Sequence, residues 1–65
     1  MSTESERVLQ FLASCPAGHT TVERKELREL LLYTDGTMMA RGRLYTIKAK
    51  HVGAGVYDVR LVARP

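Results

Sequence analysis

One cysteine and two histidines are the side chains of this sequence best suited to bind a metal or attack a substrate. Cys15 and His19 are close together, whereas His51 lies far along the chain. The set lacks a fourth ligand and matches no zinc-site spacing. Cys15 also falls on the apolar stripe of an expected helix, where a free cysteine usually serves as a small core residue. We therefore expect no metal and no enzymatic activity.

Two short glycine segments also fail to match a nucleotide-binding pattern. Residues 53–55 read GAG and residues 35–37 read DGT, and neither belongs to a GxGxxG or P-loop sequence. A single cysteine excludes an internal disulfide. The sequence therefore predicts no cofactor and favours a binding function.

Basic side chains gather in the C-terminal half of the chain. Residues 1–35 contain six acids and four bases, a net charge of −2, and residues 36–65 contain six bases and one acid, a net charge of +5. The two sums give the overall charge of +3. Such an asymmetry indicates that one end of the molecule faces an anionic partner. The alternative is that the surplus charge is an ordinary feature of a small, solvated domain.

The length allows one small domain, residues 1–65. A chain this short buries only about 60% of the surface of its unfolded form, so a homodimer is expected. The longest apolar run, residues 30–33, is far shorter than the ~20 residues that cross a bilayer. The polar start MSTESERV has no signal-peptide pattern. We expect a cytoplasmic protein with no membrane partner.

A first helix is expected near the start of the chain. Thr3 and Glu6 fit a capping box with Thr3 as the N-cap, and Pro16 stops the helix at or before Cys15. Between these limits, apolar residues recur at helical spacing and predict one stripe: Val8, Phe11, Leu12 and Cys15.

A second helix is expected from about Thr20 or Thr21, because Thr20 and Glu23 form another capping box. Its apolar face comprises Leu27, Leu30, Leu31 and Thr34. Leu32 and Tyr33 fall off this stripe. Either the helix continues through them and is buried on several faces, or it ends near Leu31 and the chain straightens.

Two structures are considered for the next segment. We favour Asp35 as the N-cap of a short helical turn over residues 36–41, closed by Gly42. Alternatively, residues 30–34 and 37–41 are two strands joined by a tight turn, since Asp-Gly is a strong hairpin signal.

The last third alternates apolar and polar residues and predicts an antiparallel hairpin, residues 43–51 with 56–62. A three-residue loop of Gly53, Ala54 and Gly55 puts the apolar residues of both strands on one face, and its glycines supply the positive φ that such loops need. It predicts three inward pairs: Ile47 with Leu61, Ala49 with Val59, and His51 with Tyr57.

The same register predicts the composition of the opposite face. Lys50 pairs with Asp58, and Lys48 lies opposite Arg60, a like-charge pair that costs on the order of a few tenths of a kcal/mol. Long side chains can splay apart in water at little cost. The functional interpretation is that this basic strip contacts phosphates. Its members are Arg41, Arg43, Lys48, Lys50 and Arg60.

The order helix, helix, short helical turn and basic hairpin is similar to that of winged-helix DNA-binding domains, in which a hairpin wing flanks a helix lying in the groove. The stretch ARGRLYTIKAKHVGAGVYDVRLVARP, residues 40–65, also resembles the C-terminal hairpin of the small phage Cro repressors. The resemblance implies that four residues lie near the groove: Thr37, Met38, Arg41 and Arg43. It also implies that Lys48, Lys50 and Arg60 lie near phosphates.

We therefore predict an α+β fold in which two helices pack on a C-terminal hairpin, with a short helical turn or an extra strand at residues 35–41. We predict that the protein is a small DNA-binding regulator of the phage or mobile-element type. Its predicted DNA contacts are Thr37, Arg41, Arg43, Lys48, Lys50 and Arg60. The alternative is an inhibitor or adaptor that binds a host protein and no nucleic acid, through Leu32, Tyr33, Met38 and Met39.

Overall fold

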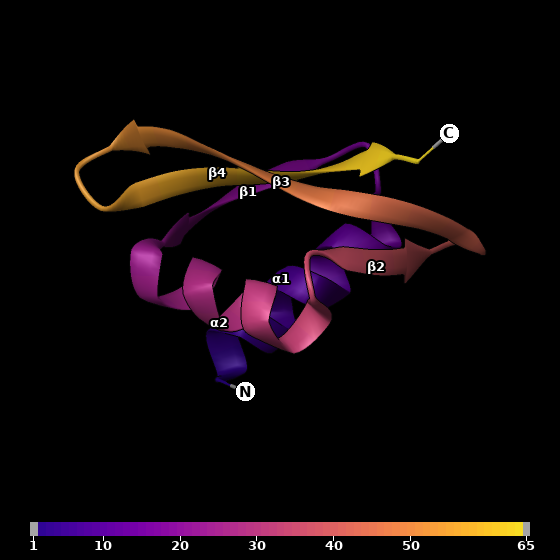
Figure 1. Ribbon diagram of the computed structural model, residues 1–65, viewed down its shortest axis with the longest axis horizontal. Helices are drawn as coiled ribbons and strands as arrows, with labels where there is room; N and C mark the ends of the chain where they lie inside the picture. Colours follow the sequence, from indigo (N-terminus) through magenta and orange to yellow (C-terminus); the bar gives the residue numbers. More distant parts are fainter. Residues whose placement is uncertain (1, 65) are drawn as a thin grey trace.

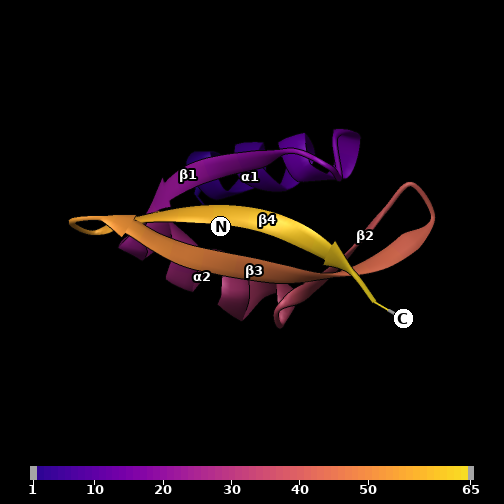
Figure 2. The ribbon, with the colours of Figure 1, turned by 90° about the horizontal axis from the view of Figure 1, so that it is seen from above.

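The protein is a four-stranded antiparallel sheet with two helices on one of its faces (Figure 1). The computed structural model describes residues 2–64. Strand order in the sheet is β1-β4-β3-β2, so the first strand lies beside the last. The predicted α+β class is confirmed, and the predicted hairpin is the centre of a larger sheet that curls in the view from above (Figure 2). The elements are α1 (Thr3–Ser14), β1 (His19–Glu23), α2 (Arg24–Thr34), β2 (Thr37–Ala40), β3 (Arg43–Gly53) and β4 (Val56–Ala63).

Helix α1 is capped by Ser2 rather than by Thr3. The Ser2 Oγ accepts a hydrogen bond from the Ser5 N–H at 3.2 Å, which satisfies one of the unpaired donors of the first turn. Phe11 is 42% exposed and Cys15 is exposed. The buried face of the helix is therefore rotated from the predicted stripe and consists of Ser5, Val8 and Leu12.

Helix α2 begins at Arg24, so the predicted start at Thr20 or Thr21 is wrong. Residues 19–23 form a strand instead, because their β-branched side chains suit a sheet and β4 offers an edge to pair with. No side chain caps α2. Its first N–H, on Arg24, donates to the carbonyl of Gly55 at 3.0 Å, so the end of the β3–β4 hairpin caps this helix.

Segment 35–41 contains a strand, so the favoured helical turn is wrong and the extra strand is correct. Asp35 ends α2 at φ 57 and Gly36 follows at φ 80, a left-handed pair that turns the chain away from the helix. The strand β2 pairs with β3, whereas residues 30–34 stay helical. The alternative prediction, a hairpin of residues 30–34 with 37–41, is therefore wrong in its first strand: β2 pairs with β3 instead.

The turn between β2 and β3 consists of Arg41 and Gly42, with φ 51 and φ 76. Positive φ at both positions is typical of the type I′ turn, whose twist matches that of the strands it joins. Gly42 thus serves a hairpin and not the end of a helical turn.

The register of the β3–β4 hairpin is the predicted one, and all three predicted inward pairs occur. The rings of His51 and Tyr57 lie 5.0 Å apart, centre to centre. Towards the tip the register shifts between His51 and Gly53, and Gly53 pairs with Val56. The loop therefore consists of Ala54 and Gly55, and the predicted three-residue loop is wrong because Gly53 belongs to β3. Gly55 has a positive φ, of 69, and Gly53 does not.

The core lies between the helices and the sheet. Its most deeply buried apolar side chains come from α1, α2 and β4, and they are Leu12, Leu30 and Val59. Leu32 and Tyr33 are 80% and 69% exposed, so α2 is buried along one stripe only. Because both helices cover the same face, the opposite face of the sheet is left to solvent. Within residues 2–64, no helix combines the length and apolarity needed to cross a bilayer.

Candidate nucleic-acid interface

The face of the sheet opposite the helices carries basic side chains on three adjacent strands. Paired residues of antiparallel strands share a face, so the register aligns two rows across β1, β4 and β3. One row consists of His19, Arg60 and Lys48, and the next consists of Thr21, Asp58 and Lys50. Neighbouring strands lie about 4.8 Å apart. We call these six residues the outer basic face.

Three of the six predicted DNA contacts, Lys48, Lys50 and Arg60, lie together on this face. A fourth, Thr37, pairs with Thr46 on the outward side of β2, next to the row that contains Lys48. The structure therefore brings four of the predicted residues to one surface.

Arg41 and Arg43 do not join the outer basic face. The Arg41 Nε and Nη2 donate to the carbonyl of Ser14 at 3.3 and 2.9 Å, which satisfies a backbone acceptor at the end of α1. Arg43 pairs with the buried Ala40 and has the inward register of Tyr45, although it is exposed at the start of β3. The predicted continuous strip of five basic residues is therefore divided between two sides of the sheet.

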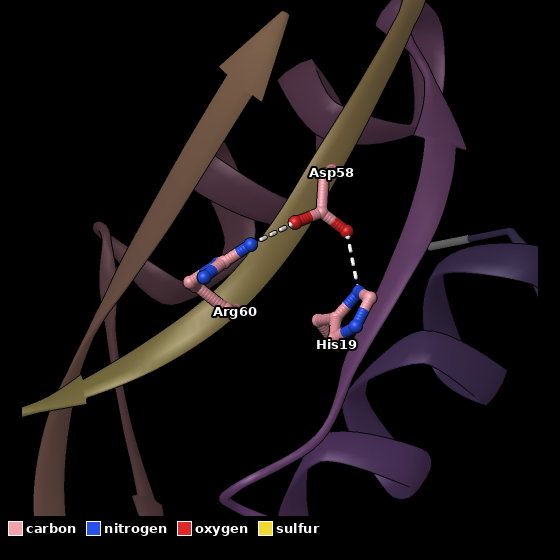
Figure 3. Close-up of polar contacts among 3 residues, drawn as sticks. All are labelled: His19, Asp58 and Arg60. Atoms are coloured by element: carbon pink, nitrogen blue, oxygen red, sulfur yellow. Dashed lines mark hydrogen bonds and ion pairs between the residues drawn. The ribbon is translucent and has the colours of Figure 1, made fainter. Parts of the chain in front are cut away.

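Asp58 occupies the centre of the outer basic face, yet its side chain is only 8% exposed. Its Oδ1 accepts from His19 Nδ1 at 2.8 Å and its Oδ2 accepts from Arg60 Nη2 at 2.6 Å (Figure 3). Because a carboxylate can only accept, the His19 Nδ1 carries a proton. The hydrogen bond from Arg60 and that from His19 lower the pKa of Asp58 against the opposing effect of burial, since both bonds favour the ionised form.

The partners of Asp58 differ from those expected from the sequence. Lys50 is its cross-strand neighbour, as predicted. The carboxylate instead bonds to Arg60, two residues along its own strand, and to His19 on β1. His19 was missed because residues 20–23 resembled a helix start. The signal that could have found it is the run of β-branched residues 20–22, which alternates outward and inward as a strand does.

These bonds decide which charges of the outer basic face are available. Arg60 is engaged with Asp58 but remains 53% exposed, and a guanidinium has five N–H donors. Neither Lys48 nor Lys50 forms an ion pair with any residue in 2–64. The two ammonium groups are therefore the cations most available to an anionic ligand.

A histidine held by a carboxylate can also act as a general base in an enzyme. Here the row neighbours of His19 are Arg60 and Lys48, which are cations and not activated nucleophiles. His19 is 64% exposed, and its arrangement with Arg60 lies on an open sheet surface. The geometry suits the binding of an anion at a surface better than the enclosure of a substrate.

The structure also divides the predicted protein interface. Leu32 and Tyr33 are adjacent and exposed on α2. Met38 packs against the core on the inward side of β2, whereas Met39 is 58% exposed on the outward side. The four residues therefore do not present their side chains to one surface.

The resemblance to winged-helix and Cro-type regulators stays a prediction, because comparison with known proteins provides no relative. A functional argument therefore rests on the geometry and charge of the surface that residues 2–64 form. The chain matches no family model, no curated protein and no solved structure.

Proposed function

We propose that this protein is a small DNA-binding regulator that contacts phosphates through its outer basic face. The supporting observation is the position of Lys48, Lys50 and Arg60 on adjacent strands of a sheet face that no helix covers. Cations on such a surface bind DNA by displacing counterions from the phosphates, which is favourable whatever the base sequence. Of the net charge of +5 on residues 36–65, Lys48, Lys50, Arg60 and Asp58 place +2 (three bases minus one acid) on this face. Arg41 and Arg43 lie elsewhere.

The proposed contact uses a sheet in place of a recognition helix. The described residues 35–42 contain β2 and no helix, so this segment supplies no recognition helix. We therefore propose a resemblance to winged-helix and Cro-type regulators for the hairpin alone. The major groove of DNA admits a two-stranded β-ribbon as well as a helix. In this protein β1 and β2 flank the β3–β4 hairpin, so we expect the sheet face to lie across the phosphates and not to enter the groove as a free ribbon. Thr37, on β2 at the side of this face, is the candidate for any base contact. We also propose a homodimeric, cytoplasmic regulator of the phage or mobile-element type.

The experiment measures binding to a fluorescent random-sequence duplex by anisotropy over a range of salt concentrations. The test variant is Lys48→Gln with Lys50→Gln, which removes two charges without placing a new carboxylate beside Asp58. We expect weaker binding and a salt dependence, log K against log salt, that is shallower by about 2. Arg60 is left unchanged because it holds Asp58.

The matched control is Arg7→Gln with Lys25→Gln, which makes the same change in net charge on the two helices. It should keep the wild-type salt dependence, and circular dichroism should show that both double variants are folded. Equal losses in the two variants would place the contact elsewhere. A wild-type protein that binds no duplex at about 50 mM salt, where electrostatic binding is strong, would end the proposal.

A further inference from the structure

A second concave surface lies on the helical side of the molecule. It is a groove of about 400 Å³ beside α2, bounded on the other side by Tyr57 of β4. The lining residues are Arg24, Leu27, Arg28, Leu31, Leu32 and Tyr57. None of these residues belongs to the outer basic face, so the groove is a separate surface.

The floor of the groove is apolar and graded in depth. Leu27 is 8% exposed and belongs to the core, Leu31 is 37% exposed, and Leu32 is 80% exposed. Tyr57 is half-buried and packs against the core. Leucine side chains that remain this exposed beside a concave surface lose their contact with water when a ligand covers them. The floor therefore suits an apolar side chain of a partner.

The rim of the groove is basic. Arg24 and Arg28 are one helical turn apart and both are exposed. Neither forms an ion pair with another residue in the described part of the chain, 2–64. Two exposed guanidinium groups next to an apolar floor match a ligand that combines carboxylates with an apolar anchor.

One backbone hydrogen bond joins the two sides of the groove. The Arg24 N–H donates to the Gly55 carbonyl at 3.0 Å, which ties the end of the hairpin to the start of α2. On the hairpin, the ring of Tyr57 lies 5.0 Å from that of His51. Because the backbone on the two sides is already joined, binding loses less conformational entropy than it would if these segments had first to be brought together.

We propose that this groove binds an acidic, amphipathic peptide segment of a partner protein. An apolar side chain of the segment packs on Leu27, Leu31 and Leu32, and its carboxylates pair with Arg24 and Arg28. A flat anionic membrane is the competing ligand for a basic and apolar surface, and binding to vesicles in the test distinguishes it from a peptide. The proposal is independent of DNA binding, which uses the opposite face of the sheet.

The test uses a fluorescent synthetic peptide of about three helical turns, with Leu and Phe at i, i+3, i+4 and i+7 and with Asp and Glu between them. Two companion peptides replace either the acids by their amides or the apolar anchors by Ala. We expect saturable anisotropy binding of the first peptide only. Equal binding of the amide peptide, or no binding of the acidic one, would overturn the proposal.

Protein variants then locate the site. Leu32→Ser should weaken binding about tenfold or more, as expected for losing the burial of one leucine, while its neighbour Tyr33→Ser outside the groove should change little. Arg28→Glu should weaken binding and the distant Arg7→Glu should not. Equal effects within either pair would overturn the proposal, as would Leu32-dependent binding to phosphatidylserine vesicles without peptide binding.

The two functional proposals can fail separately. Lys48→Gln with Lys50→Gln, which lowers DNA affinity in the first proposal, should leave affinity for the acidic peptide unchanged. If that variant abolishes peptide binding while Leu32→Ser does not, the peptide lies on the outer basic face and the groove is not its site.

Discussion

Oδ1 of Asp58 lies 2.8 Å from Nδ1 of His19, although the two residues are 39 positions apart in the sequence. The contact joins β4 to the edge strand β1 on the face opposite the helices. The same carboxylate holds Arg60 at 2.6 Å. Asp58 therefore has two roles: it ties an edge strand to the sheet, and it reduces the positive charge at the centre of the outer basic face.

Acid should weaken the contribution of Asp58 to stability. Hydrogen bonds from Arg60 and His19 lower its pKa in the folded protein from the usual 3.8, so its stabilising effect is fully present above the unfolded-state pKa and is lost as the pH falls through the folded-state pKa. We expect Asp58→Asn to have a lower urea midpoint than the wild type at about pH 5, with the difference shrinking below about pH 3. A difference that is the same at both pH values would contradict this account.

Two leucines two residues apart on α2 should differ sharply in their effect on stability. Leu30 is fully buried, with 0% exposure, and Leu32 is 80% exposed. Leu30→Ala should lower the free energy of unfolding by about 2–5 kcal/mol or leave the chain unfolded, because it opens a cavity in the core. Leu32→Ala should stay within about 0.5 kcal/mol. Urea denaturation followed by circular dichroism measures both, and similar costs would mean that α2 buries a different face.

Gly42, in the β2–β3 turn, and Gly53, at the end of β3, should not be equally replaceable. Gly42 has φ 76, so Gly42→Ala should lower the free energy of unfolding by about 1–2 kcal/mol. Gly53 has no positive φ, and an added Cβ would meet only the Val56 Cβ at 4.0 Å. Gly53→Ala should therefore be close to neutral in the same denaturation experiment. A larger loss of stability for Gly53→Ala than for Gly42→Ala would contradict the backbone angles of these two glycines.

Arg41 and Lys48 should contribute differently to DNA binding, although both are basic residues of the C-terminal half. The guanidinium of Arg41 is engaged with the Ser14 carbonyl, whereas Lys48 has no ion pair within residues 2–64. Lys48→Gln should make the salt dependence of duplex affinity shallower by about 1. Arg41→Gln should leave it unchanged, and an equal change in both variants would extend the interface to the β2–β3 turn.

Sequence-based prediction failed for segments that can form hydrogen bonds either with residues nearby in the sequence or with a strand far along the chain. Thr20 and Glu23 fit a capping box, which is a local signal, but β4 is available to residues 19–23 only in the folded chain. In the same way, Asp35 and Gly36 resemble a hairpin turn whose first strand proves to be the end of α2. A local sequence pattern is compatible with more than one secondary structure. The tertiary contacts that the segment forms determine which of them is adopted.

What the sequence by itself determined is the register of the β3–β4 hairpin. Its alternation has a period of two, and a slip of one residue would turn Ile47 and every other inward side chain of its strand to solvent. Only the tertiary structure decided the composition of the outer basic face. His19 joins it through β1, Arg41 leaves it for the end of α1, and Asp58 bonds to His19 and Arg60 instead of Lys50. The physical reason is that a long polar side chain can form hydrogen bonds with several different groups. The order of the strands in the sheet determines which of these groups lie close enough.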